Sequence, residues 1–185
     1  KLHNYWFEKN NINLSYDRRK INKSEIQGII NEIKDNKLDG INVTVPFKTD
    51  VIPFLDTLSE EAQITQSVNT IYMHDKKLVG HNTDIKGFEL SLKDTQFDLN
   101  NKSIFILGAG GVVPSIIYAL EKLGVSKISV SNRTKEKAEE LKKNFPNIGL
   151  VDWGHQAEFD MIINATSLGL SKEDEIGLNL SLIHI

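Results

Sequence analysis

The sequence predicts an α/β protein built from two parts, and three observations predict this fold class. Short apolar runs alternate with amphipathic segments along the 185 residues, which is the pattern of strands alternating with helices. A polar, turn-prone stretch over residues 94–102 marks a boundary between two regions of this kind. The second region opens on a strand, a glycine turn and an apolar helix, as a βαβ unit with a parallel sheet does. We therefore expect one domain over residues 1–100 and a second, doubly wound domain over residues 101–185.

The composition is that of an ordinary globular protein, with 39% hydrophobic and 25% charged residues, and it argues against a disordered tail, a collagen-like fibre and a coiled coil. The formal net charge is −3, without the concentrated basic face that nucleic-acid binding needs. No stretch approaches the ~20 apolar residues of a membrane span. Cysteine is absent, which excludes disulfides and thiolate metal sites and fits a reducing compartment. We expect a cytoplasmic protein that binds neither nucleic acid nor membranes.

In the first part, Ser24 and Gln27 have capping-box spacing, in which two side chains satisfy free donors at a helix start. Residues 41–45 alternate strictly between apolar and polar, so Asn42 and Thr44 share one face of a strand. Pro46 ends this strand and suits the first turn of a short helix up to about residue 55. The spacing also predicts a helix around residues 3–7, an apolar helical stripe of Ile26, Ile29, Ile30 and Ile33, a strand pair over 67–73 and 77–82, and a helix over 84–93.

In the second part, a simpler rhythm predicts parallel strands joined by helices. The expected strands are 103–107, 127–131 and 159–164, with a helix over 134–143. The helix after the glycine turn should bury Val112, Val113, Ile116, Ile117 and Leu120, which recur at helical spacing.

The glycine turn contains Gly108, Gly110 and Gly111 between a strand and a helix. A dinucleotide pyrophosphate needs close approach of the backbone at such a turn, and the helix N-terminus offers free N–H groups to its charge. A complete fingerprint has a third small residue at the position of Val113. The alternative is a tight turn without a ligand, but the flanking strand and helix favour nucleotide binding.

The end of the next strand decides between the two nicotinamide cofactors. Residues 131–134 read Ser-Asn-Arg-Thr, without the carboxylate that usually holds the free ribose hydroxyls of NAD. Arg133 would pair with a 2′-phosphate through its planar, always charged fork and could stack on the adenine, and Asn132 and Thr134 add neutral donors. In the alternative, Thr134 only caps the next helix and Arg133 is a solvated charge. NADP(H) is the expected cofactor.

The first part carries polar residues that packing does not require. Lys48 follows a strand end, and Asp84 lies at another junction between a strand and a helix. If these ends converge, the lysine and the aspartate form a pair suited to proton transfer at a substrate hydroxyl or carbonyl. In the alternative, Asp84 or a neighbouring residue is a helix N-cap and Lys48 is an exposed lysine.

Six motifs together closely resemble the shikimate/quinate dehydrogenase family, over about residues 1–170. In chain order they are Asn-Val-Thr-Val-Pro-Phe-Lys (42–48), Ser-Val-Asn-Thr (67–70), Asn-Thr-Asp (82–84), Gly-Ala-Gly-Gly (108–111), Asn-Arg-Thr (132–134) and Asn-Ala-Thr-Ser-Leu-Gly (164–169). The first and third motifs are highly specific to this family, whereas the glycine turn is common to many dehydrogenases.

The resemblance implies a substrate domain followed by a Rossmann-like NADP domain, and reversible, NADP-dependent reduction of 3-dehydroshikimate to shikimate in aromatic amino-acid biosynthesis. It implies that Lys48 is the proton donor and acceptor, with Asp84 as its partner and a substrate ligand. It implies that Thr44 and Asn69 bind substrate hydroxyls and that Asn42 supports the site. It places Glu60 near the cofactor. The other residues that it assigns to the cofactor are Gly108, Ala109, Gly110, Gly111 and Val112 at the pyrophosphate, Asn132, Arg133 and Thr134 at the adenosine phosphate, and Asn164, Ala165 and Thr166 at the nicotinamide.

The sequence also departs from the family pattern. Family members usually begin with a strand carrying a serine pair for the substrate carboxylate and end with helices that contribute a glutamine. Nothing before His3 or after residue 185 supplies these, so we expect the sequence to be part of a longer chain. Ile85 replaces the usual glycine after Asn-Thr-Asp, and Gln66 and Ser67 replace small residues.

These departures keep two alternatives open: a quinate-using or NAD-using relative, and a non-catalytic fragment that retains the nucleotide domain. Arg133 argues against NAD, and the lysine–aspartate pair argues against a pure binding module. The five histidines are scattered without ligand spacing, so no metal site is expected. We expect a monomer or a homodimer.

Overall fold

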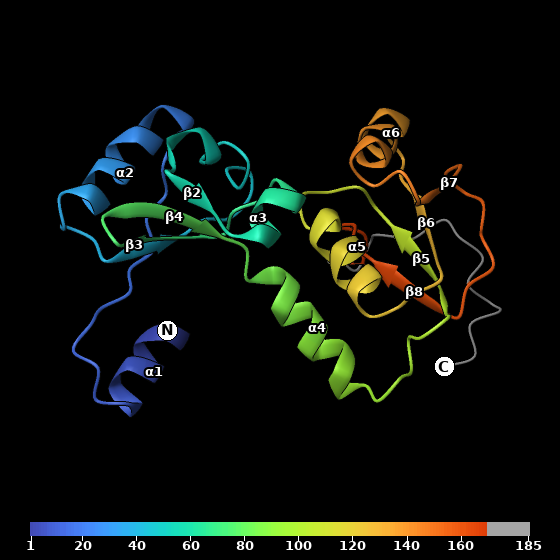
Figure 1. Cartoon of the computed structure of the whole chain (residues 1–185), viewed down its shortest axis with the longest axis horizontal. Helices are drawn as coiled ribbons and strands as arrows, with labels where there is room; N and C mark the ends of the chain where they lie inside the picture. Colours follow the sequence, from blue (N-terminus) through green and yellow to red (C-terminus); the bar gives the residue numbers. More distant parts are fainter. Residues whose placement is uncertain (170–185) are drawn as a thin grey trace.

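The computed structural model describes residues 1–169 of the chain. It contains two four-stranded sheets, each with its own helices (Figure 1). The first lobe is the sheet β1-β3-β4-β2 with α2 and α3, and the second lobe is the sheet β7-β6-β5-β8 with α5 and α6. Helix α4 runs between them. None of the helices formed by residues 1–169 combines the length and apolar character that a membrane span requires.

The elements of the first lobe and its surroundings are α1 (Leu2–Lys9), the 3-10 turn η1 (Lys23–Glu25), α2 (Ile26–Lys34), β1 (Gly40–Asn42), the 3-10 turn η2 (Ile52–Phe54), β2 (Thr57–Leu58), α3 (Glu60–Thr65), β3 (Thr70–His74) and β4 (Lys77–His81). Strands β3 and β4 form the expected antiparallel hairpin, β1 pairs antiparallel with β3, and β2 pairs parallel with β4. Helix α2 buries Ile26, Ile30 and Ile33 against this sheet, as the apolar stripe predicts. The lobe therefore has a core of its own.

The predicted capping box at Ser24 and Gln27 is wrong. The reciprocal pair is Asn22 and Glu25, with the Asn22 backbone N–H donating to Glu25 at 2.7 Å. The helical segment begins with the 3-10 turn η1, which leads directly into α2. The first backbone N–H groups without a helical partner therefore lie two residues earlier than the apolar stripe indicates.

The predicted strand over 41–45 and the helix after Pro46 are also wrong in extent and kind. Strand β1 ends at Asn42, and the chain then turns until η2. The reason lies at Lys48, whose carbonyl accepts from the Val68 N–H at 2.9 Å. In an α-helix that carbonyl would accept a hydrogen bond from the N–H of residue 52, but the Ile52 N–H donates to the Thr49 carbonyl instead. A contact with a segment twenty residues away thus replaces the helical ladder.

The elements of the second lobe and the connection to it are α4 (Asp84–Asp94), β5 (Ser103–Leu107), α5 (Val113–Lys122), β6 (Lys127–Ser131), α6 (Lys135–Asn144), β7 (Gly149–Val151) and β8 (Met161–Asn164). All strands of this sheet are parallel. The order β7-β6-β5-β8 reverses direction at β5, which makes the carboxyl end of β5 the switch point where doubly wound sheets bind ligands. The predicted parallel α/β fold is confirmed.

One face of this sheet packs on the helices, and the other packs on Ala157 and Phe159 in the segment before β8. Ile104 and Ile106 lie in the main cluster with side chains of α5 and α6, whereas Phe105 and Leu107 face the other side. Val112 is 38% exposed, so its predicted burial is wrong: it is the N-cap residue of α5, and the buried stripe begins one residue later.

The helix α4 connects the lobes and packs on α5. Its Leu92 and the following Leu99 belong to the core cluster of the second lobe. The division at residue 100 remains a prediction, and residues 170–185 of the expected second domain lie outside the described part of the chain. Three short elements, β2, α3 and β7, were not expected; for α3, Ser59 and the two acidic residues after it are an ordinary N-terminal signal.

Candidate active site

Lys48 and Asp84 meet, although 36 residues separate them along the chain. Lys48 lies in the turn after β1, and Asp84 is the first residue of α4. The Lys48 Nζ lies 2.5 Å from Asp84 Oδ2, and the two side chains are 16% and 26% exposed. The pair is thus partly buried yet open to a ligand.

Asn69 holds the carboxylate of Asp84 in place. Its Nδ2 donates to Asp84 Oδ1 at 2.8 Å, so each carboxylate oxygen has one partner. Its Oδ1 accepts from the Thr83 N–H at 3.0 Å and from the Thr83 hydroxyl at 3.1 Å. The backbone N–H of Asn69 donates to the His81 carbonyl at 3.0 Å. Because both ends of the Asn69 amide are used, the orientation of the carboxylate is fixed before any ligand binds.

Asn42 lies on the other side of Asn69. The Asn42 Nδ2 donates to the Asn69 carbonyl at 3.3 Å and to the Thr70 hydroxyl at 3.1 Å, while the Tyr16 hydroxyl donates to Asn42 Oδ1 at 3.1 Å.

Thr44 is exposed in the turn before Lys48. The structure therefore brings Asn42, Asn69, Lys48 and Asp84 into one network of hydrogen bonds. None of the side-chain hydrogen bonds of this network within residues 1–169 involves Thr44.

A second candidate site surrounds the glycine turn at the end of β5. Gly108 has φ +109°, and a Cβ on it would lie 2.8 Å from the Ala165 carbonyl oxygen. The turn is anchored on both sides, because the Gly108 N–H donates to Ser131 and the Ala165 N–H donates to Leu107, each at 2.8 Å. Only glycine fits position 108 without strain, and this close approach brings the loop after β8 against the turn.

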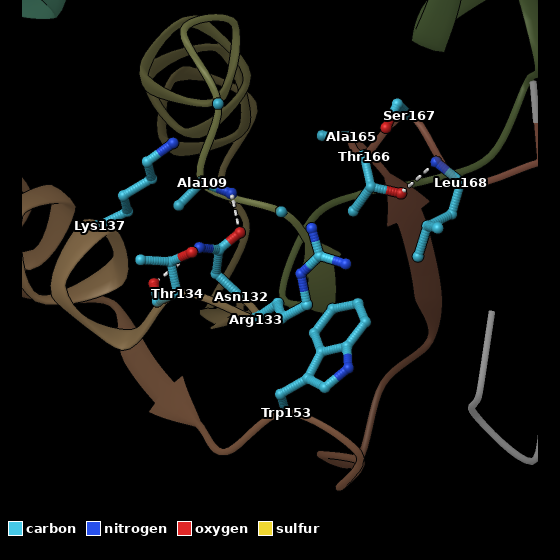
Figure 2. A pocket seen from close by; sticks show the side chains of 12 residues that line it. Ala109, Asn132, Arg133, Thr134, Lys137, Trp153, Ala165, Thr166, Ser167 and Leu168 are labelled. Atoms are coloured by element: carbon cyan, nitrogen blue, oxygen red, sulfur yellow. Dashed lines mark hydrogen bonds between the residues drawn. The ribbon is translucent and has the colours of Figure 1, made fainter.

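The glycine turn borders an open pocket of about 260 Å³, and Figure 2 shows the residues around it. Its lining residues are Gly108, Ala109, Gly110, Asn132, Arg133, Thr134, Lys137, Trp153, Ala165, Thr166, Ser167 and Leu168. Two of them are cationic, Arg133 and Lys137, and Arg133 has no acidic partner among residues 1–169. The pocket therefore presents positive charge beside a helix N-terminus, an arrangement that favours a phosphorylated ligand.

Asn132 joins the two loops on one side of this pocket. Its Oδ1 accepts from the Ala109 N–H at 3.0 Å, and its Nδ2 donates to the Thr134 carbonyl at 2.7 Å (Figure 2). Thr134 is the N-cap residue of α6 but makes no capping bond with its side chain. The side chain of Asn132 thus shapes the wall of the pocket and holds the glycine turn next to Arg133.

Asn164 organises the loop on the opposite side. Its Oδ1 accepts from the Thr166 N–H at 3.0 Å and from the Thr166 hydroxyl at 2.7 Å, and its Nδ2 donates to the Leu168 carbonyl at 2.9 Å. Ala165 and Thr166 line the pocket, whereas Asn164 does not. Gly111 and Val112 follow the lining part of the glycine turn. Glu60 lies exposed at the start of α3 and is not one of the lining residues.

The pocket contains four residues that the sequence reasoning missed: Lys137, Trp153, Ser167 and Leu168. For Lys137 a signal existed, because it lies in the first turn of α6, on the helix that begins beside Arg133. For Trp153 none existed, since only the path of the chain after β7 brings it to the pocket. Within residues 1–169, no group of three or more His, Cys, Asp and Glu side chains could hold a metal ion.

The sequence matches two family models, one for each part of the chain. Residues 1–71 match the shikimate dehydrogenase substrate binding domain, and residues 89–170 match shikimate / quinate 5-dehydrogenase. The NADP(+)-dependent shikimate dehydrogenase of Pelagibacter ubique is 57% identical over 183 residues, which cover 99% of this chain and 69% of that protein.

Solved structures show the same relationship. The shikimate dehydrogenase of Aquifex aeolicus superposes with a TM-score of 0.90 at 39% identity, covering 98% of this chain and 68% of that one. The Thermus thermophilus enzyme, crystallised with NADP(H) and shikimate, superposes with a TM-score of 0.82 at 31% identity, covering 91% of this chain and 63% of that one. The chain thus spans about two thirds of the length of these relatives. With both parts matched in order and both sheets in place, the chain belongs to the shikimate/quinate dehydrogenase family.

Proposed function

We propose that the protein catalyses the reversible, NADP-dependent reduction of 3-dehydroshikimate to shikimate, in aromatic amino-acid biosynthesis. The observation that carries this proposal is the contact of 2.5 Å between Lys48 and Asp84, in a chain whose relatives are named NADP(+)-dependent shikimate dehydrogenases. An ion pair at this position is chemically useful because an ammonium can give a proton to a carbonyl oxygen and take it back.

Lys48 moves the proton in this proposal. In the direction of reduction its ammonium donates a proton to the carbonyl oxygen of the substrate, and in the reverse direction its amine removes the proton from the hydroxyl. Asp84 Oδ2 holds the Lys48 ammonium at 2.5 Å and compensates its charge. Asn69, which fixes the carboxylate, and Thr44 bind neighbouring hydroxyls of the substrate, and Asn42 supports Asn69. A positioned general acid of this kind contributes about 10²–10⁴-fold in rate.

The residues around the glycine turn fit an NADP molecule. The backbone at residues 108–112, without side chains on the glycines, admits the pyrophosphate beside the start of α5. We assign Arg133, with Asn132 and Thr134 next to it, to the 2′-phosphate, and Lys137 adds a second positive charge to the pocket. Ala165 and Thr166 lie across the pocket on the side we assign to the nicotinamide. When bound, NADPH supplies the hydride for the reduction.

A direct assay tests this function. The protein, shown to be folded by circular dichroism, is incubated with NADP⁺ and shikimate, and the absorbance of NADPH is followed. NAD⁺ and quinate serve as parallel arms. We expect turnover with NADP⁺ and shikimate; preference for quinate or for NAD⁺ would assign a different substrate or cofactor. A folded protein that binds NADP⁺ without turnover would contradict the catalytic proposal and leave a nucleotide-binding relative.

The proposal includes a cytoplasmic location and a monomer or homodimer as the working unit. Fractionation of the cells that produce the protein naturally measures its location. Sedimentation of the purified protein measures its oligomeric state.

A further inference from the structure

Asn82 contacts both lobes with one buried side chain. It precedes Asp84 by two residues and is only 1% exposed. Its Nδ2 donates to the Thr65 hydroxyl in α3 of the first lobe at 3.1 Å and to the Ser115 hydroxyl in α5 of the second lobe at 2.9 Å. Its Oδ1 accepts from the Asp84 N–H at 3.0 Å. Both N–H groups of the amide are therefore used, one on each lobe.

These bonds form a continuous path between the two candidate sites. Ser115 lies in the first turn of α5, and its N–H donates to the carbonyl of Val112, directly after the glycine turn. From Ser115 the path runs through the Asn82 amide to the backbone of Asp84, and from the Asp84 carboxylate to Lys48. In Figure 1, α4 begins where α3 and α5 approach each other, and α3 and α5 are in contact.

A role as a helix cap does not account for all of these contacts. The N-cap residue of α4 is Thr83, and to satisfy the first free N–H of the helix Asn82 needs only the bond from the Asp84 N–H to its Oδ1. The bond to Ser115 adds a polar group to a stretch of α5 whose other buried residues are apolar or alanine: Val113, Ile116, Ile117, Ala119 and Leu120. The Ser115 residue is itself 1% exposed. Burial of two such groups is costly unless they bond to each other, so the contact fixes how α5 sits relative to Asp84.

We infer that Asn82 is a positioning residue that couples the cofactor helix α5 to the carboxylate of Asp84. NADP bound at the start of α5 then favours the arrangement of Asp84 that binds shikimate, and shikimate favours the binding of NADP to the same extent. This inference rests on the proposed function, because it takes NADP and shikimate as the ligands of the two sites.

Two matched variants separate this coupling from simple structural support. Ser115→Ala removes the acceptor on the cofactor helix, and Thr65→Val removes the acceptor on the first lobe while keeping its shape. Both leave one N–H of the same buried amide without its partner. Thr65→Val also loses the bond of 2.6 Å from the Thr65 hydroxyl to the Glu61 carbonyl, so it should cost more stability than Ser115→Ala and is the more demanding control. The affinity of shikimate is measured by calorimetry for each protein, with and without saturating NADP⁺.

In the wild type we expect NADP⁺ to tighten shikimate binding by about fivefold or more, the lower end of usual couplings. The ratio to compare is the Kd of shikimate without NADP⁺ divided by its Kd with saturating NADP⁺. In Ser115→Ala this ratio should fall close to one, while in Thr65→Val it should stay at the wild-type value. A wild-type ratio of one, an unchanged ratio in Ser115→Ala, or equal loss in both variants would overturn the inference while leaving the proposed function standing. Failure of the wild type to bind either ligand would instead refute both.

A spectroscopic measurement follows the path itself and keeps the test independent of shikimate. The N–H resonance of Asp84, which reports its bond to Asn82, should shift when NADP⁺ is added to the wild type. In Ser115→Ala that shift should be lost although NADP⁺ still binds. An equal shift in both proteins would contradict the path through Ser115.

Discussion

Lys48 and Asp84 owe their geometry to groups on other elements rather than to each other alone. The carbonyl of Lys48 is held by the Val68 N–H, and Asp84 receives Asn69 on its second carboxylate oxygen. A lysine held in this way at two points loses little conformational entropy when the substrate binds. The partial exposure of the pair leaves room for the substrate oxygen.

Replacement of Lys48 by alanine tests its role in proton transfer. We expect kcat for shikimate oxidation to fall by about 10²–10⁴-fold, because the acid–base group is lost, whereas the Kd of shikimate changes much less. Steady-state kinetics and calorimetry measure the two quantities. Lys86→Ala is a suitable control, since Lys86 is an exposed lysine of α4 that pairs with Glu89 instead. Equal losses in turnover and in affinity would show that Lys48 only binds.

Arg133 should determine the preference for NADP over NAD. Without an acidic partner among the described residues, its charge is available to a 2′-phosphate, and a charge-assisted hydrogen bond is worth about 1.5–3 kcal/mol. Arg133→Ala should therefore weaken NADP⁺ binding by about 10–100-fold and leave NAD⁺ binding nearly unchanged. Fluorescence titration with both nucleotides measures this, and parallel losses for the two would place Arg133 away from the 2′-phosphate.

At the scale of elements, α4 is joined to α5 by Glu89 as well as by apolar contacts. Glu89 is buried, and its carboxylate lies 3.3 Å from both Lys122 on α5 and Lys86 on its own helix. Burial alone would raise the pKa of Glu89, but the hydrogen bonds and positive charges of Lys122 and Lys86 outweigh it and hold the pKa below the ordinary value of 4.5. The folded state thus favours the ionised carboxylate.

This direction of shift predicts how stability depends on pH. A carboxylate whose pKa is lower in the folded state stabilises the protein above its unfolded pKa, and this contribution is lost as the pH falls through the folded value. The free energy of unfolding of the wild type should therefore exceed that of Glu89→Gln at neutral pH, and the difference should shrink below pH 4.5. Urea denaturation at several pH values measures it. A difference that grows on acidification would mean that burial, not the lysines, dominates.

The helices and strands also show which sequence signals were reliable. The spacing of isoleucines in α2 and the apolar run of β5 predicted these elements well, because each buries one continuous surface against a sheet. The helix expected after Pro46 does not form, because the Lys48 carbonyl bonds to Val68 across the lobe. Helix α3 is only six residues long, too short for a periodic pattern to be recognised. Local signals thus failed where long-range hydrogen bonds compete or where the element is short.

For the whole molecule, the two lobes have separate cores but share α4 and the buried Asn82 network. Leu92 of α4 packs in the core of the second lobe, while the first residue of the same helix belongs to the site in the first lobe. A ligand that binds one lobe should therefore also stabilise the other.

Hydrogen exchange with and without NADP⁺ tests this connection. At a concentration 100 times the Kd, NADP⁺ should raise the free energy of unfolding by about 2.7 kcal/mol. We expect the amides of β3 and β4 in the first lobe to gain the same protection as those of β5 and β6 in the second, because the lobes open as one unit. Protection confined to β5 and β6 would mean that the lobes unfold independently.

The sequence by itself determined the family, the parallel sheet with its glycine turn, and most of the candidate site residues. These properties are encoded locally: apolar periodicity specifies the strands and helices, and the order of six short motifs specifies the family. Gly108 is a clear case, since it follows the apolar run of β5 directly and its positive φ of +109° is a backbone conformation that favours glycine.

Only the tertiary structure decided that Lys48 and Asp84 touch, that Trp153 and Lys137 border the pocket, and that Asn82 joins α3 to α5. The physical reason is common to all of these: each depends on how segments distant in sequence are packed together. Such packing is fixed by the burial of the two cores together with hydrogen bonds between distant segments, such as the one from the Val68 N–H to the Lys48 carbonyl.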